Sequence, residues 1–378
     1  MPADVVLAPA DRAVEALIGL LARRGYTVIA PTVRDGAIVL DQVHRVEDLP
    51  IGWNDEQDAA TYRLTRTGGG AIFDYAVGPY SPRRYLSEPR RTLWSARRTD
   101  DGFELADDEA APPRYAFVGV RACELAAVAV QDRVLRDGPH PDPAYSRARA
   151  AAFFVGVNCA KPAATCFCTS MGTGPAIEAG HDLAATELLS PERHELLVSA
   201  ATTRGAEVLA ELQALVAWRT PDDGDREAER AILAGSVDRM TRRLDPAAAR
   251  DVLRSNLDHP RWDDVASRCL SCTNCTLVCP TCFCSAVEDV TSLDGDHAER
   301  VQRWDSCFSL GHSVLHGAGA VRGDTRARYR QWLTHKLSTW WDQFGQSGCV
   351  GCGRCISWCP AGIDLTEEVA AIQSEEPT

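Results

Sequence analysis

Two cysteine-rich runs near the C-terminal end constrain the fold of this chain more than any other feature. The first is CLSCTNCTLVCP and the second is CVGCGRCISWCP. Their cysteines are Cys269, Cys272, Cys275 and Cys279 in the first run, and Cys349, Cys352, Cys355 and Cys359 in the second. Both follow the spacing C-x2-C-x2-C-x3-C-P, which is typical of bacterial proteins with two iron-sulfur clusters. The proline after each run suits a turn that leaves the cluster, because no backbone donor is needed there.

The spacing also predicts which cysteines hold which cluster. Three thiolates two residues apart can wrap one face of a cubane, while the fourth cysteine begins a helix that points away and ligates the other cluster. The first 4Fe-4S cluster would then take Cys269, Cys272, Cys275 and Cys359, and the second would take Cys349, Cys352, Cys355 and Cys279. Zinc also accepts four thiolates. However, its sites usually combine two C-x2-C pairs a dozen or more residues apart, so the runs favour iron and sulfur.

The overall composition indicates a protein of a reducing compartment that does not bind nucleic acid. The formal net charge is -13, which disfavours a nucleic-acid partner. The opening residues contain neither a basic segment nor an uninterrupted apolar segment of the kind that directs export, and no run of 18 apolar residues occurs. We therefore expect a cytoplasmic protein that does not span a membrane. The 15 cysteines then indicate metal ligation rather than a disulfide framework.

Four cysteines far upstream predict a third iron-sulfur site. YAFVGV and FFVGV have the continuous apolar character of neighbouring parallel strands, and Cys123 and Cys159 follow them closely. Ligands bind at the carboxyl ends of such strands, where a turn would return Cys166 and Cys168 towards the other two. Because C-x-C strains the joint binding of one cluster, an oxygen ligand could replace one thiolate. The acidic candidates nearby in the sequence are Glu124, Asp182 and Glu187.

The three cysteines that remain lie inside the C-terminal region. They are Cys282, Cys284 and Cys307. We expect them to be buried or to lie behind the cluster ligands, because free cysteine is among the most buried residue types. The insert between the two runs, residues 285–348, is expected to form helices packed over the clusters.

The pattern of elements predicts an α+β or α/β multidomain protein. A mixed α/β domain would occupy residues 1–219 and include the extra iron-sulfur site, and a helical two-cluster ferredoxin-like domain would occupy residues 220–378. Within the first domain we expect a helix at 11–24, a hairpin at 28–43 that turns at Asp35 and Gly36, and a helix near 182–189. No G-x-G-x-x-G or G-x-x-x-x-G-K-[ST] motif occurs, so the redox partners must be other polypeptides.

Several sequence segments together resemble those of a known protein family. They are RACELAAVAVQDRVL, NCAKPAATCFCTSMGTGP, CPTCFC, and WDSC followed by CVGCGRCISWCPAGIDL. In this order they resemble the iron-sulfur beta subunit of cytoplasmic, NAD(P)-linked NiFe hydrogenases, also called sulfhydrogenases. The A subunit of anaerobic sulfite reductase is similar. The resemblance covers residues 115–365.

The resemblance implies an electron relay that makes or breaks no substrate bond itself and so has no catalytic residues. It would carry electrons between an FAD- and NAD(P)-binding reductase subunit and the small and large subunits of a NiFe hydrogenase, or a sirohaem sulfite reductase subunit. The matching ligands are the eight cysteines of the two runs with Cys123, Cys159 and Cys166, and with Cys168 or an acidic residue as the last. Two alternatives stay open: the A subunit of an anaerobic sulfite reductase, and a self-contained enzyme with thiol chemistry beside a cluster. The choice between NAD and NADP also stays open.

Overall fold

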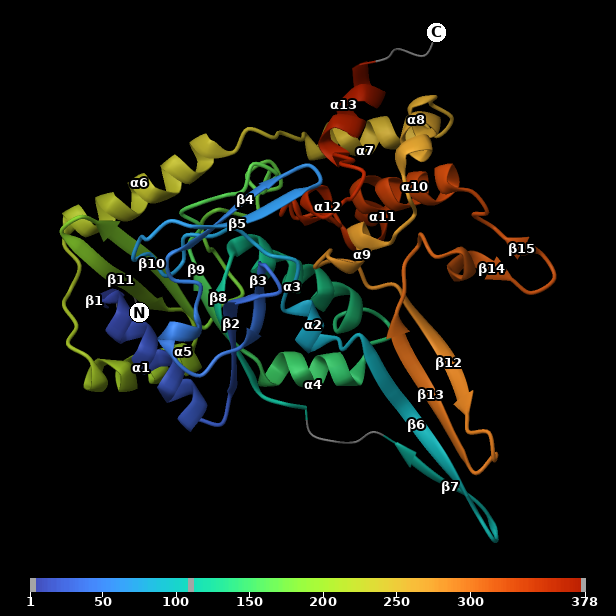
Figure 1. Cartoon of the computed structure of the whole chain (residues 1–378), viewed down its shortest axis with the longest axis horizontal. Coiled ribbons are helices and arrows are strands. Elements are labelled where there is room, and N and C mark those ends of the chain that lie inside the picture. The colour runs from blue at the N-terminus through green and yellow to red at the C-terminus, as the bar shows by residue number, and fades with distance from the viewer. Residues whose placement is uncertain (1–4, 108–111, 375–378) are drawn as a thin grey trace.

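A seven-stranded mixed sheet forms the centre of the N-terminal part of the molecule (Figure 1). The structure is a computed structural model that describes residues 5–107 and 112–374. In spatial order the strands are β1 (Val5–Pro9), β11 (Arg193–Ala200), β10 (Leu183–Ser190), β9 (Phe153–Val157), β8 (Tyr115–Val120), β2 (Thr27–Arg34) and β3 (Ala37–Gln42). The pairings from β10 through β9 and β8 to β2 are parallel, and the outer pairings are antiparallel.

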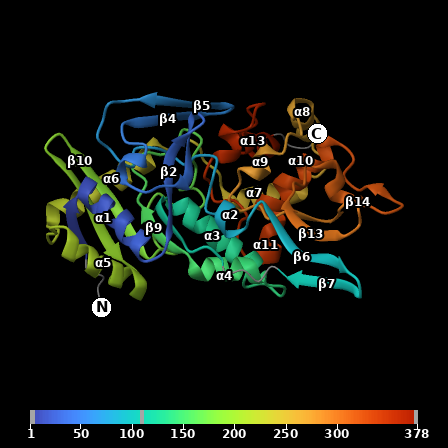
Figure 2. The ribbon, with the colours of Figure 1, turned by 60° about the horizontal axis from the view of Figure 1, so that its bottom comes forward.

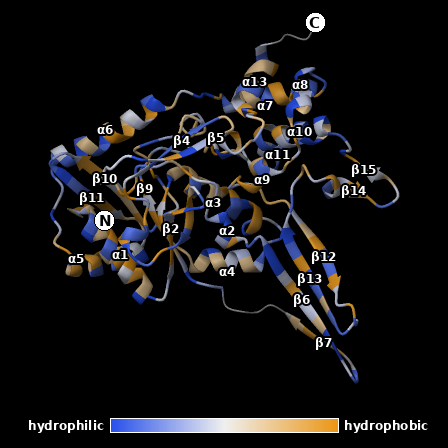
Figure 3. Ribbon diagram, in the orientation of Figure 1, coloured by the Kyte–Doolittle hydropathy of each residue, from blue (hydrophilic) through white to orange (hydrophobic). Residues whose placement is uncertain are grey.

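Helices cover both faces of this sheet, which explains the continuous apolar runs of β8 and β9. Alternate residues of a strand point to opposite faces. Ala116 and Val118 pack in one core with α1 (Ala10–Arg23) and α5 (Thr203–Leu215). Phe117 packs in another core with α3 (Ala122–Leu135) and α4 (Pro143–Ala151), and Val120 joins it because an irregularity at Gly119 shifts the alternation. The hydropathy colouring shows the apolar strands between these helices (Figure 3). The expected parallel neighbours, the first helix and the hairpin that turns at Asp35 and Gly36 are confirmed.

The helix that we expected near residues 182–189 is wrong, because this segment is β10. The segment HDLAATELL consists largely of good helix formers. However, Leu183 and Ala185 are buried on the sheet, and the strand pairs with β9 on one side and β11 on the other. Burial between two strands therefore overrides the local propensity.

The C-terminal part is a set of short helices around a second core (Figure 1). They are α7 (Pro246–Ser255), α8 (Arg261–Arg268), α9 (Asn274–Leu277), α10 (Thr325–Thr334), the π-helical turn η3 (His335–Thr339), α11 (Trp340–Phe344), α12 (Arg354–Ser357) and α13 (Leu365–Ser374). The longer helix α6 (Asp223–Arg239) precedes them and packs on the seven-stranded sheet beside β10 and β11 (Figure 1). Trp262, Leu333 and Ile356 are fully buried in the second core. The mixed α/β fold with a helical C-terminal part is thus confirmed.

The first half of the insert between the cysteine runs is not helical, which corrects our expectation. It forms the hairpin of β12 (Ser285–Thr291) and β13 (His297–Trp304), which turns through Gly295 at a φ of 74°. The turn Asp294-Gly295 is a hairpin signal, and Val287, Val290 and Thr291 favour strands. After η2 (Leu310–Ser313) and the two-residue strands β14 (Val314–Leu315) and β15 (Gly319–Ala320), only the second half of the insert is helical.

The β12–β13 hairpin extends a sheet that begins in the N-terminal part. β13 pairs with β6 (Arg90–Thr99), which pairs with β7 (Gly102–Asp107), and the four strands form an arm that projects from the molecule (Figures 1 and 2). A second hairpin, β4 (Trp53–Asp58) and β5 (Thr61–Arg66), packs its Tyr62 ring 5.0 Å from that of Trp358. Contacts therefore cross the predicted domain boundary at residues 219 and 220, which stays a prediction.

The remaining short elements connect these parts. η1 (Val46–Asp48) follows β3, and α2 (Arg83–Leu86) precedes β6. In the part of the chain that the structure describes, no helix combines the length and the apolar character that crossing a membrane requires.

Candidate metal centres

The two cysteine runs fold into loops with the same backbone conformation. Ser271 and Thr273 in the first loop adopt φ values of 50° and 70°, and Gly351 and Gly353 at the matching positions of the second adopt 64° and 74°. A short helix follows each loop at the matching place, α9 in the first and α12 in the second. The backbone N-H two residues after the first cysteine donates to its sulfur at 3.4 Å in both loops. The duplicated spacing thus produces a duplicated structure.

Four cysteines from both runs line one cavity at the outer end of the C-terminal part. We call Cys269, Cys272, Cys275 and Cys359 the first cysteine set. Cys355 of the other run also lines this cavity, together with Phe308, Tyr329 and Trp332. The fold therefore brings the last cysteine of the second run to the first loop, as the spacing predicts.

The chemistry of this cavity fits a cluster with sulfide acceptors. The hydroxyl of Tyr329 and the indole N-H of Trp332 are buried there without a hydrogen-bond partner among the described residues. Burial, followed by the charges of Glu368 and nearby thiolates, raises the pKa of Tyr329 well above its ordinary value, so the hydroxyl keeps its proton. An unpaired buried donor is costly, and an acceptor in the cavity would satisfy it.

The second cysteine set lies deeper. It consists of Cys349, Cys352, Cys355 and Cys279. Burial, followed by the charges of the other three sulfurs, raises the pKa of the Cys355 thiol well above its ordinary value. Metal binding opposes this penalty, because a thiol loses its proton when it ligates a metal. The ammonium of Lys336 lies beside this set, with Nζ 3.2 Å from the Sγ of Cys279.

Lys336 is held by neutral partners as well as by sulfur. Its Nζ donates to the hydroxyl of Thr281 at 3.1 Å and to the carbonyl of Gly348 at 3.3 Å. The side chain extends from the π-helical turn η3 and is 3% exposed. No ion pair of Lys336 with a carboxylate is found among the residues that the structure describes. Negative charge on the cysteine sulfurs is therefore what balances this buried cation.

The third cysteine set collects at the carboxyl ends of β8 and β9. Cys123 is the second residue of α3, which follows β8 after a single residue, and Cys159 follows β9. Cys166 and Cys168 return on the next loop and pack with Cys123 in one buried cluster, which Cys352 also contacts. Burial, followed by the charges of Cys159 and Cys352, raises the pKa of Cys168 to about 12. The structure thus brings Cys123, Cys166 and Cys168 together beside Cys352 of the second set, and Cys159 lies close enough for its charge to act on Cys168.

The acidic candidates for the third site are engaged elsewhere. Glu124 forms an ion pair of 2.5 Å with Arg354 and accepts the backbone N-H of Arg121 at 3.0 Å. Asp182 accepts from the N-H of Phe154, the hydroxyl of Thr202 and the guanidinium of Arg204. Glu187 accepts the N-H groups of Ile72 and Phe73 and pairs with His194. Cys168 is therefore the better fourth donor.

Buried cations beside the cysteine sets are the functional residues that sequence reasoning missed. Arg354 is 1% exposed and lies near Cys352 and Cys123, and Arg121 is 2% exposed and lies near Cys159. Arg83 is also buried and lies near Cys279 and Cys282. These residues differ from surface arginines only in their three-dimensional surroundings, so the sequence carries no local signal for them.

The three cysteines outside these sets lie against the first run. The thiol of Cys282 forms a hydrogen bond with the Cys279 thiol, and the thiol of Cys284 forms one with the Cys307 thiol. Cys282 is buried, whereas Cys284 and Cys307 are half-buried. The buried position of Cys282 agrees with the sequence-based expectation, whereas for Cys284 and Cys307 a place behind the cluster ligands stays a prediction.

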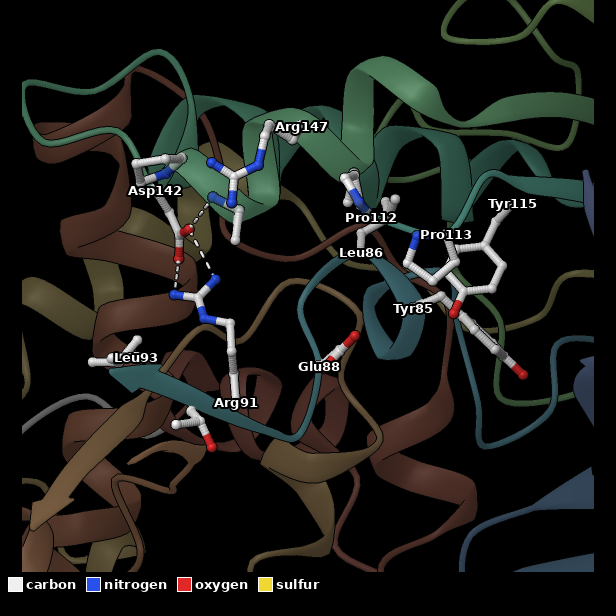
Figure 4. Close-up of a pocket in the computed structure, with 14 residues that line it drawn as sticks. Tyr85, Leu86, Glu88, Arg91, Leu93, Pro112, Pro113, Tyr115, Asp142 and Arg147 are labelled. Carbon is white, nitrogen blue, oxygen red and sulfur yellow. Dashed lines mark hydrogen bonds and ion pairs between the residues drawn. The ribbon is translucent and has the colours of Figure 1, made fainter. Parts of the chain in front are cut away.

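A separate cavity lies between α4 and the base of the arm (Figure 4). Arg91 crosses it and forms two hydrogen bonds of 3.0 Å with Asp142, which also caps α4. Tyr85, Glu88 and Tyr115 line the opposite side. None of the described residues that line it is a cysteine, so this cavity is not part of the metal centres.

Comparisons with known proteins support two iron-sulfur clusters in the C-terminal part. Residues 268–363 match a family model described as a 4Fe-4S dicluster domain, and this range includes all eight cysteines of the two runs. The chain is also similar to "Sulfhydrogenase 2 subunit beta" of Pyrococcus furiosus. The two are 30% identical over 327 residues, which is 85% of this chain and 92% of the relative.

Proposed function

Because this chain belongs to the family of sulfhydrogenase beta subunits, we propose that it transfers electrons between partner subunits through three adjacent iron-sulfur sites. A 4Fe-4S cluster exchanges one electron at a time when it is bound to cysteine thiolates. The first set would hold one cluster through Cys269, Cys272, Cys275 and Cys359, and the second set would hold another through Cys349, Cys352, Cys355 and Cys279. The third set would hold a third through Cys123, Cys159, Cys166 and Cys168.

The observation that carries this proposal is that the three cysteine sets are contiguous. Cys355 belongs to the second set and also lines the cavity of the first. Cys352 belongs to the second set and packs against the third. Each set is therefore adjacent to the next, and the second set lies between the other two. This order is what a relay of single electrons requires.

The two ends of the proposed relay differ in their exposure to solvent. Cys272 is exposed, and the neighbouring Leu270 is 68% exposed, so the first set lies next to solvent. Cys123, Cys166 and Cys168 of the third set are buried beneath the helices and loops around them. We propose that one partner subunit docks over the Leu270 loop, because the path from a partner to a cluster is shortest there.

The buried cations would hold the negative charge of the cysteine sets in a dry environment. Lys336 lies beside the second set, and Arg354 lies between the second and third sets. Buried positive charge favours the reduced, more negative state of a neighbouring cluster. The positive charge of Lys336 and Arg354 at the second set, in the centre of the relay, would therefore stabilise an electron that arrives there.

The identity of the partners follows from the relative and stays part of the proposal. The relative's name supports a hydrogenase complex over a sirohaem sulfite reductase. We propose an FAD- and NAD(P)-binding reductase subunit on one side and the NiFe hydrogenase subunits on the other, in the cytoplasm. The catalytic metals would lie on those partners, and this chain would supply no catalytic residue.

Metal analysis of anaerobically purified protein tests the proposal. We expect about twelve irons and as many acid-labile sulfides per chain, because each 4Fe-4S cluster holds four of each. About eight irons would contradict the third cluster and leave the other two in place. Zinc without sulfide would contradict the proposed relay as a whole. A co-purifying nickel protein is expected, and a sirohaem protein in its place would assign the chain to sulfite reduction.

A further inference from the structure

A cavity of about 480 Å³ lies between the first cysteine loop and the base of the arm, where α2, α9 and β13 come together (Figures 1 and 2). Small-molecule sites have volumes of about 300–1,000 Å³ and often lie where two parts of a fold meet. None of the described residues that line this cavity is a cysteine. The cavity is therefore separate from the three cysteine sets and has no role in the relay described above.

The inner wall of the cavity is the end of the first cysteine loop. Leu277 and Val278 line it, and Val278 is the chain neighbour of Cys279, which belongs to the second cysteine set. The guanidinium of Arg83 holds this wall in place, because it donates to the carbonyls of Thr276 and Cys279 at 3.2 and 3.1 Å. A molecule in the cavity would therefore contact the neighbour of a cluster ligand.

Aromatic and apolar side chains form much of the remaining lining. Tyr80 and Trp304 contribute rings, and Val290 is 48% exposed on the side of the arm. The Trp304 ring is fixed, because Arg83 lies 3.6 Å from its ring centre and its indole N-H donates to the carbonyl of Ser87 at 2.9 Å. Such a lining suits a ligand with a ring system.

Three arginines give the cavity a positive charge. They are Arg84, Arg90 and Arg303, and Glu288 is the one carboxylate among the described lining residues. Three cations against one carboxylate leave an excess of two positive charges, in a chain whose formal net charge is -13. A local excess of the opposite sign attracts an anion to this place.

The arm places two of these arginines directly opposite each other. Arg303 of β13 is in register with Arg90 of β6, so both side chains lie on the same face of the sheet. Like charges at such positions destabilise a sheet. Arg303 pairs with Glu288, and Arg90 pairs with Glu299 at 3.3 Å, but both pairs are exposed and therefore contribute little. An anion between the two guanidiniums would relieve their repulsion.

Arg84 completes the set of cations. Its guanidinium lies 4.4 Å from the ring centre of Tyr80, on the exposed surface of α2. No carboxylate pairs with Arg84 in the part of the chain that the structure describes. A planar guanidinium can bind two oxygens of a phosphate at once, so Arg84 has the chemistry of an anion ligand.

We propose that this cavity binds a planar aromatic anion of the class of flavin mononucleotide, which takes electrons from the adjacent second iron-sulfur site. The ring system would lie against Leu277 and Val278, and the phosphate would lie on Arg84, Arg90 and Arg303. The binding is argued from the cavity alone, whereas the electron transfer rests on the proposed relay.

The electron transfer needs no reactant beyond the relay, the ligand and water. Reduced clusters would give up two electrons one at a time and return to their oxidised state. The bound flavin would gain these two electrons and two protons from water, and no covalent bond to the protein would form or break. The site would thus connect clusters that carry electrons singly with a diffusible carrier of electron pairs.

Isothermal titration calorimetry of the complete, cluster-loaded chain under anaerobic conditions tests the binding. The probes are flavin mononucleotide and riboflavin, which has the same ring system without the phosphate. We expect flavin mononucleotide to bind at least about tenfold more tightly, which corresponds to about 1.4 kcal/mol.

Two arginine variants locate the phosphate. Arg84→Ala should weaken the binding of flavin mononucleotide at least about fivefold, because a charge-assisted contact is lost, and should leave that of riboflavin unchanged. Arg98→Ala removes an exposed arginine near the outer end of β6, away from the cavity, and should behave as the wild type. Equal weakening by both variants would assign the effect to the overall charge and overturn the proposed site.

Stopped-flow mixing tests the electron transfer. The chain is reduced with a stoichiometric amount of dithionite and mixed anaerobically with flavin mononucleotide. The rate of cluster reoxidation should saturate as the flavin concentration rises, and half-saturation should need at least about fivefold more flavin in Arg84→Ala than in the wild type. A rate that rises linearly and equally in both proteins would show transfer by collision elsewhere, and would overturn the transfer at this site.

The results separate this site from the relay. A wild-type chain with normal iron and sulfide that binds neither flavin, or binds both equally, would overturn the proposal and leave the relay intact. Absence of clusters would overturn the relay, while the calorimetry would still decide the binding. If the native complex with its partner subunits did not bind the flavin, the cavity would belong to a subunit interface and the proposal would be wrong.

Discussion

Lys336 offers the sharpest test at the scale of a single residue. Its ammonium donates to the Cys279 sulfur from a buried position, and its other two partners are neutral oxygens. A hydrogen bond to a charged acceptor contributes about 1.5–3 kcal/mol. Since the charge on the second set increases on reduction, part of this energy favours the reduced state.

We therefore predict that Lys336→Met lowers the reduction potential of the second cluster. The expected change in the reduction equilibrium is about tenfold, which corresponds to about 1.4 kcal/mol. An EPR-monitored redox titration measures it. Arg326→Met removes a partly exposed cation on α10 that pairs with the surface residue Asp263, and it should leave the potential unchanged. Equal potentials in all three proteins would show that Lys336 does not tune the site.

Cys168 decides the ligand set of the third site. We predict that Cys168→Ser removes about four irons per chain, because the acidic alternatives are engaged in other contacts. Cys284→Ser makes the same chemical change outside the three sets and should retain all the iron. Colorimetric iron analysis of both variants is sufficient. If Cys168→Ser kept the full iron content, an oxygen ligand would complete the third site.

At the scale of elements, the two cysteine loops show how much a glycine matters. The left-handed conformation costs a residue other than glycine about 1 kcal/mol, and Thr273 adopts it without a side-chain cap. Gly353 at the matching position is constrained further, because a Cβ there would lie 2.4 Å from the carbonyl oxygen of Thr165. The first loop thus tolerates a side chain that the second excludes.

This difference predicts opposite effects for a matched pair of substitutions. Thr273→Gly should leave the free energy of unfolding unchanged or raise it by up to about 1 kcal/mol, because relief of strain exceeds the added entropy of the unfolded chain. Gly353→Thr should lower it by about 2 kcal/mol or more through overpacking. Thermal unfolding of the cluster-loaded variants measures both. Similar melting temperatures for the two variants would contradict the constraint at Gly353.

The sequence predicts those elements whose local pattern and tertiary surroundings agree. β8 and β9 are apolar throughout and are buried on both faces, and α1 has one apolar stripe. The residues of β10 favour a helix, while its two neighbouring strands decide its conformation, so the local pattern misleads. The β12–β13 hairpin has a turn signal at Asp294-Gly295. This two-residue signal does not outweigh the expectation that the insert forms helices over the clusters.

The residues of the candidate sites also fall into those that the sequence predicts and those that it does not. The cysteines of the two runs are recognisable because their spacing is local, and the two neighbouring strands indicate the third set. The buried cations could not be predicted. Arg83 and Arg354 acquire their roles from contacts with residues about 195 and 230 positions away, and no local pattern marks them.

At the scale of the whole molecule, the two halves depend on one another. Arg83 holds two carbonyls of the first cysteine loop, Glu124 pairs with Arg354 of the second loop, and β6 pairs with β13. All three contacts cross the predicted boundary between residues 219 and 220. Removing the N-terminal half would leave the edge of β13 unpaired and Arg354 without its counter-charge.

We therefore predict that residues 220–378 expressed alone aggregate and retain less than the iron of two clusters. Size-exclusion chromatography with iron analysis checks this, with the full chain prepared in parallel as the control. A monomeric fragment with about eight irons would instead establish an independent domain at this boundary.

Contiguity of the three cysteine sets is the central claim, and EPR spectroscopy of the fully reduced protein tests it most directly. Clusters in adjacent sites interact magnetically, so the spectrum of the fully reduced chain should be broadened and split relative to that of a partly reduced sample. A sum of independent, unsplit signals at full reduction, or no cluster signal at all, would contradict the relay.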